Sequence, residues 1–166
     1  MPTPSRMSSP RRARCNALAA LLLGTLAAPA AHALDAAQWK AVAPALQAAL
    51  ECRTKPDMTT AAWQALPHDG TGGVGPFTPP APFTVFGLPV RQVTLFIDTS
   101  GELGESYSAD VDASMAAVRK AAKLNAAGGR TTTMGELMLA EGDGRQLTCT
   151  IAGSYDESDY QEPEGL

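Results

Sequence analysis

The first 33 residues most constrain what this chain can fold into, because they have the pattern of a secretory leader. Four arginines and no acidic residue precede an apolar run that extends from about Ala17 to Ala28. Ala31 and Ala33 then supply the small side chains of a cleavage site, so we place the cut after Ala33. The apolar run is little more than half the ~20 residues that a membrane span needs. We therefore expect residues 1–33 to be removed on export, with no stable membrane insertion afterwards.

Removal of the leader changes the composition of what must fold. Of the 166 residues, 133 remain, which is the size of one ordinary domain. Four of the 13 Lys and Arg residues leave, so nine remain against 17 Asp and Glu, and the net charge becomes −8. A chain with this balance does not carry the basic footprint of a nucleic-acid binder, and an anionic membrane surface would repel it. We expect a periplasmic or secreted protein.

Two cysteines, Cys52 and Cys149, remain in the mature chain. They are an even pair in an oxidising compartment and are 97 positions apart. Cys149 alternates with Leu147 and Ile151, so it should face the core, and Cys52 ends an apolar helix. The alternative is a redox or nucleophilic thiol, but neither cysteine belongs to a C-x-x-C motif. The pattern favours a disulfide that joins the N-terminal helix to the last strand.

The N-terminal part of the mature chain has helical periodicity followed by a stretch rich in breakers. Asp35 can cap a helix that ends near Cys52, and Pro44 predicts a kink or a division into two pieces. A short helix from Thr60 to Leu66 is stopped by a proline. The density of Gly and Pro from 67 to 89 then predicts a long connector with no helix or central strand.

The C-terminal half alternates apolar and polar residues in four runs, which is the period of half-buried strands. The apolar positions of these runs are Val93, Leu95 and Ile97; Tyr107, Ala109 and Val111; Leu137 and Leu139; and Leu147, Cys149 and Ile151. A helix capped by Asp112 and closed by Gly128 separates the first pair of runs from the second. We predict a single small α+β domain (34–153) with an antiparallel sheet of about four strands, in which two hairpins are separated by a helix and the helices pack on one face. Residues 154–166 form an acidic tail that we expect to be disordered.

Two local motifs could carry chemistry, but their contexts argue against it. The run from Gly70 to Gly75 has the G-x-G-x-x-G spacing, yet prolines follow where a helix should begin. His68 could serve as a base or a metal ligand, although it is the one histidine of the mature chain and zinc sites usually need three or four ligands. We predict no cofactor, no metal site and no catalytic residue.

The remaining candidates are binding residues. Phe77, Phe83 and Phe86 punctuate the connector, and they would either form an apolar strip that docks a partner or tether the connector to the sheet. Asp156, Glu157 and Asp159 in the tail could meet a basic partner.

These features together favour a small exported protein-binding or inhibitor-like module that engages a basic envelope or secreted protein. Two alternatives stay open. One is an envelope hydrolase that uses carboxylates and His68, and the other is a structural or assembly accessory protein of the envelope.

Overall fold

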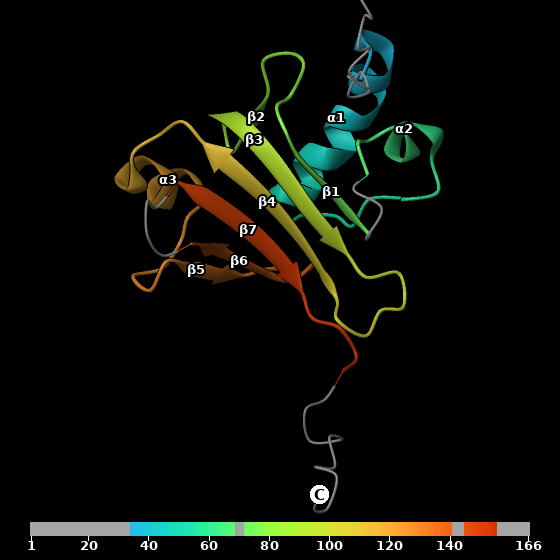
Figure 1. Cartoon of the computed structure of the whole chain (residues 1–166). Coiled ribbons are helices and arrows are strands. Elements are labelled where there is room, and N and C mark those ends of the chain that lie inside the picture. Colours follow the sequence, from blue (N-terminus) through green and yellow to red (C-terminus); the bar gives the residue numbers. More distant parts are fainter. Residues whose placement is uncertain (1–33, 69–71, 141–144, 156–166) are drawn as a thin grey trace, which may run out of the picture. The chain divides into compact units, whose positions relative to one another are not determined.

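The computed structural model describes residues 34–68, 72–140 and 145–155, which form an α+β fold around one antiparallel sheet (Figure 1). The helices are α1 (Ala36–Leu50), α2 (Ala61–Gln64) and α3 (Met115–Ala121). The strands are β1 (Gly73–Phe77), β2 (Thr84–Val85), β3 (Leu88–Ile97), β4 (Glu105–Val111), β5 (Gly129–Thr131), β6 (Glu136–Leu139) and β7 (Gln146–Ile151). Their order in the sheet is β1-β3-β4-β7-β6-β5, and β2 pairs with β3. None of the helices within these ranges has the length and apolarity to cross a membrane.

The predicted fold class is confirmed, but the strand count is corrected from about four to seven. The predicted helix arrangement also needs correction. α1 packs on the sheet through β4 and β7, and α2 packs on α1. α3 lies apart from that pair in Figure 1, beside the segment that leads to β5. There Arg119 donates to the Ala126 carbonyl oxygen at 2.8 Å.

Helix α1 begins at a capping box and runs without interruption to Leu50. The Asp35 carboxylate accepts the N–H groups of Ala37 and Gln38 at 2.8 Å, and the Gln38 side chain accepts the Asp35 N–H. The sequence left open a kink or a division at Pro44; α1 is one helix with Pro44 inside it, exposed, so the helix is not divided into two pieces. The apolar face at spacings of three and four is buried as expected: Trp39, Val42, Leu46, Ala49 and Leu50.

The core lies between α1 and one face of the sheet. The four alternating runs form β3, β4, β6 and β7, and their apolar positions face this core. Across the sheet, Leu95 pairs with Tyr107, Tyr107 with Cys149, and Cys149 with Leu137. The alternate positions, on the outer face of the sheet, include several hydroxyl side chains, and the Ser108 and Thr148 hydroxyls are 2.9 Å apart.

The predicted disulfide joins Cys52 to Cys149 across the core. Its position follows from the way α1 ends. Cys52 has φ 57° and donates to the Ala49 carbonyl, while the Arg53 N–H reaches the Ala48 carbonyl. This is a Schellman arrangement, in which the left-handed residue is usually glycine. Here a cysteine takes that position, and its side chain is directed onto β7, where both sulfur-bearing residues are buried.

The predicted connector 67–89 contains two strands that the sequence pattern did not indicate. β1 is an edge strand, where proline is tolerated, because a residue without an N–H group need not donate to strands on both sides. Gly75 has φ 88°, and a Cβ there would lie 2.6 Å from the Val93 carbonyl oxygen, so glycine permits the approach to β3. β2 is joined to β3 by Phe86 and Gly87 with φ of 53° and 75°, the signs that a two-residue hairpin turn requires.

The buried carboxylate of Glu105 joins the start of β4 to the segment after α1. The Tyr107 hydroxyl donates to one Glu105 oxygen at 2.5 Å, and Lys55 Nζ lies 2.6 Å from the other. Burial, and secondarily the bond to Glu105, raise the pKa of Tyr107 far above its usual value.

The Tyr107→Phe substitution should lower the free energy of unfolding by roughly 1–3 kcal/mol, because a buried carboxylate oxygen of Glu105 loses its donor. The raised pKa of Tyr107 stabilises the fold below the unfolded tyrosine pKa of about 10, and this contribution is lost as the pH rises further. Urea denaturation at pH 7 and at alkaline pH measures both effects. If Tyr107→Phe matches the wild type at pH 7, the hydrogen bond contributes nothing.

Candidate functional site

The predicted binding residues of the connector lie on or near the core. Phe83 is buried, with its ring 5.1 Å from that of Trp39 in an edge-on contact. Phe77 and Phe86 are half-buried and pack against the core, and the Arg130 guanidinium carbon lies 5.6 Å from the centre of the Phe86 ring. These positions correspond to the tethering alternative. Docking by these rings stays a prediction.

The other predicted residues are dispersed or lie outside the described ranges. His68 is exposed and pairs with Val74 as an isolated β-bridge at the edge of β1. The tail residues Asp156, Glu157 and Asp159 lie outside the residues that the structure describes. Within those residues, no three His, Cys, Asp or Glu side chains are grouped so that they could hold a metal ion.

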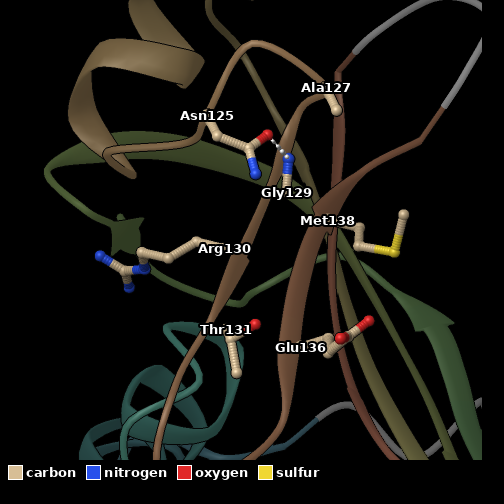
Figure 2. Close-up of a pocket in the computed structure, with 7 residues that line it drawn as sticks. All are labelled: Asn125, Ala127, Gly129, Arg130, Thr131, Glu136 and Met138. Carbon is tan, nitrogen blue, oxygen red and sulfur yellow. Dashed lines mark hydrogen bonds between the residues drawn. The ribbon is translucent and has the colours of Figure 1, made fainter.

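A hollow of about 220 Å³ lies over the β5–β6 hairpin. Its lining residues are Asn125, Ala127, Gly129, Arg130, Thr131, Glu136 and Met138 (Figure 2). Asn125 pairs with the free edge of β5: its Oδ1 accepts the Gly129 N–H at 3.0 Å, and its N–H reaches the Gly129 carbonyl at 2.9 Å. Figure 2 shows the Arg130 side chain directed away from Glu136, so their charges do not converge on one point.

This hollow is smaller than the ~300–1,000 Å³ of ordinary ligand pockets. The hydrogen bonds of Asn125 also have a structural use, since they cover the polar groups of an edge strand. The hollow is therefore a weak candidate for a binding site.

The distribution of exposed apolar side chains indicates a candidate site at the turn between β3 and β4. In the described part of the chain, five large apolar side chains are exposed: Phe96 at 42%, Leu103 at 68%, Met115 at 44%, Met138 at 49% and Tyr155 at 55%. Phe96, Leu103 and Tyr155 belong to one region, which we call the hairpin end. It consists of Phe96, the loop 98–104, and residues 153–155, which follow β7.

The loop of the hairpin end is organised by the Asp98 carboxylate. Oδ1 accepts the Ser100 N–H at 2.9 Å, and Oδ2 accepts the Leu103 N–H at 2.7 Å. The Ser100 hydroxyl adds contacts of 2.8 and 2.7 Å to the two oxygens. The loop is closed at its base because the Asp98 N–H donates to the Gly104 carbonyl at 3.1 Å.

The segment after β7 holds the loop from its other side. Ser154 N–H donates to the Gly101 carbonyl, and Tyr155 N–H donates to the Glu102 carbonyl, both at 2.9 Å. Gly104 and Gly153 allow this close approach, since a Cβ on either one would overlap with backbone atoms of the facing segment. The loop is thus fixed within itself and against a segment about 50 residues away in sequence.

The charges of the hairpin end are acidic. Asp98 and Glu102 lie in the loop, and no Lys or Arg occurs in 96–104 or 153–155. Hydrogen bonds, first from the Leu103 N–H and then from Ser100, hold the pKa of Asp98 below its usual range. The loop contacts are therefore complete above the unfolded aspartate pKa of about 3.9 and are lost only as the pH falls through the lowered folded value.

The sequence pattern indicated a turn here and no site. The signal that was available is Leu103 itself, an apolar residue between two glycines of a turn with no alternating neighbours. Comparison with protein-family models, with curated proteins and with solved structures finds no match for this chain.

Proposed function

We propose that this chain is an exported, non-catalytic module that binds a protein partner through the hairpin end. The observation that carries the proposal is that three of the five exposed large apolar side chains of the described residues belong to one fixed loop and the segments beside it: Phe96, Leu103 and Tyr155. Exposed apolar side chains that gather in one place mark interaction sites, whereas single ones are normal. The buried disulfide supports an oxidising compartment, and the leader pattern supports export.

The partner we propose has a basic surface. Asp98 and Glu102 lie in the same loop as Leu103, and the sequence continues into a tail rich in Asp and Glu. Complementary charge speeds association and selects against wrong partners. This proposal moves the binding site from the connector phenylalanines to the hairpin end and keeps the acidic character first inferred from the composition.

The test is to introduce a lysine at the hairpin end and at a matched position. Phe96 and Met138 are exposed to similar extents, and both lie on the outer face of the sheet. Phe96→Lys should weaken binding of an envelope protein at least tenfold, because a cation would then face a basic surface without its apolar contact. Met138→Lys should bind as the wild type does.

The measurement is quantitative capture from periplasmic extract of the host cells, at low and at high salt, followed by titration of the captured protein. Binding should weaken as the salt concentration rises, because charges at the rim of an interface are screened. Equal loss of binding by Phe96→Lys and Met138→Lys would contradict the assignment to the hairpin end.

A further inference from the structure

Leu103 differs from the other exposed apolar residues in how it is held. It is the most exposed of the five at 68%, yet its own N–H is bonded to Asp98 Oδ2 at 2.7 Å. The residues on both sides are also fixed: the Glu102 N–H reaches the Ser100 hydroxyl at 3.2 Å, and the Glu102 carbonyl accepts the Tyr155 N–H at 2.9 Å. The backbone of Leu103 is therefore held in place by hydrogen bonds, while its side chain is mostly exposed to solvent.

An apolar side chain on a fixed backbone is suited to binding by insertion. A flexible loop must lose conformational freedom when it binds, whereas a loop already held in one conformation avoids most of that cost. The side chains that dominate binding energies are those that fill a desolvated pocket at the centre of an interface. A flat partner surface would bury only one side of Leu103, but a recessed pocket would enclose it.

Resting on the proposed function, we infer that Leu103 is the anchor of the complex and enters a recessed apolar pocket on a protein partner whose rim carries Lys or Arg. The pocket is sized for an aliphatic side chain. Its basic rim complements Glu102, which directly precedes the anchor. The partner is therefore a protein with an open cleft, and this chain occludes that cleft in the manner of an inhibitor.

Asp98 is the positioning residue of this arrangement. Its carboxylate holds the Leu103 N–H and both polar groups of Ser100, and it needs no contact with the partner to do so. The acidic side chains of the loop disfavour the other use of an exposed leucine, which is insertion into an anionic membrane. Vesicle binding serves as a test of that alternative.

The first experiment places a photo-crosslinking amino acid at single positions of the full exported chain in its host cells. Positions 103, 96 and 155 sample the hairpin end, and position 115 on α3 is an exposed apolar control. We expect a strong adduct with one protein from position 103, mapping to a cleft of that protein, and none from position 115. Adducts from 96 or 155 without one from 103 would overturn insertion but keep the proposed function. No adduct from any of the three would overturn both.

The second experiment measures affinity for the cross-linked protein after its purification. Leu103→Ala should raise the Kd at least 30-fold, while the control Met115→Ala should change it less than twofold. Both side chains are exposed, so both variants should have the same melting temperature as the wild type. Equal Kd values for Leu103→Ala and the wild type would overturn the inference.

Asp98→Ala tests the positioning role with Leu103 still present. It should raise the Kd about tenfold, and the Leu103 amide should exchange with solvent at least tenfold faster in the unbound protein. Faster exchange with an unchanged Kd would overturn the role of loop order. Binding of the full chain to phosphatidylglycerol vesicles that is lost in Leu103→Ala would overturn the choice of a protein partner.

Discussion

Removing the disulfide should lower the free energy of unfolding by about 2–5 kcal/mol. The bridge between Cys52 and Cys149 closes a loop with a sequence separation of 97, and the loop-entropy model gives roughly 4.7 kcal/mol for a loop of about this length. It also joins the end of α1 to β7, a central strand of the sheet. Reduction therefore releases the helix that covers the core.

The measurement is urea denaturation of the wild type with and without a thiol reductant. The control is the Cys52→Ala/Cys149→Ala double variant, which should have a midpoint close to that of the reduced wild type and should not respond to reductant. Mass spectrometry of the exported protein checks the premise. Two free thiols in that protein, or a midpoint that is unaffected by reductant, would contradict the role of the bridge.

Those parts of the fold that leave a local pattern in the sequence were predictable. β3, β4, β6 and β7 alternate apolar and polar residues because one face is buried, and the alternation is visible in the sequence. The cysteine pair was predictable for a similar reason, since Cys149 has the same alternation and Cys52 follows a periodic helix.

The missed strands depend on distant partners. Gly75 and Pro76 in β1 are helix and strand breakers by propensity, and they are tolerated because β3 supplies the ladder on one side only. β5 contains a glycine and is three residues long, and its order comes from β6 and from the side chain of Asn125. Tertiary pairing overrides local propensity in both cases.

The candidate site could not be predicted from the sequence because it also depends on a contact between distant segments. The turn at 98–104 is local, and Asp98 is an ordinary residue for the start of a turn. The approach of Tyr155 to Glu102 is a long-range contact that no periodicity encodes. The connector phenylalanines are aromatic residues in a loop-like sequence, which is typical of a binding strip, yet Phe83 is buried in contact with Trp39 on α1.

The glycines of the hairpin end make the link between stability and the proposed binding testable. Gly104 has φ 82°, and a Cβ there would overlap with the Ile151 carbonyl oxygen. Gly101 has φ 80° in the same loop, but nothing lies within 4 Å of its Cβ position. The two positions share the cost of a left-handed conformation, about 1–2 kcal/mol for a residue other than glycine, and differ in the steric overlap.

Gly104→Ala should therefore lower the free energy of unfolding by about 2–5 kcal/mol, because roughly 1–3 kcal/mol of overpacking adds to the backbone strain. Gly101→Ala should lower the free energy of unfolding only by the backbone strain, about 1–2 kcal/mol. Urea denaturation gives both values, and amide exchange of Leu103 and Tyr155 reports whether the loop has moved. If the Gly104 variant folds with normal exchange at both amides and the same stability as the Gly101 variant, the close packing of β7 against the loop does not hold the hairpin end. In that case the order that presents Leu103 would have to come from Asp98 alone, and Asp98→Ala would then abolish binding, not merely weaken it about tenfold.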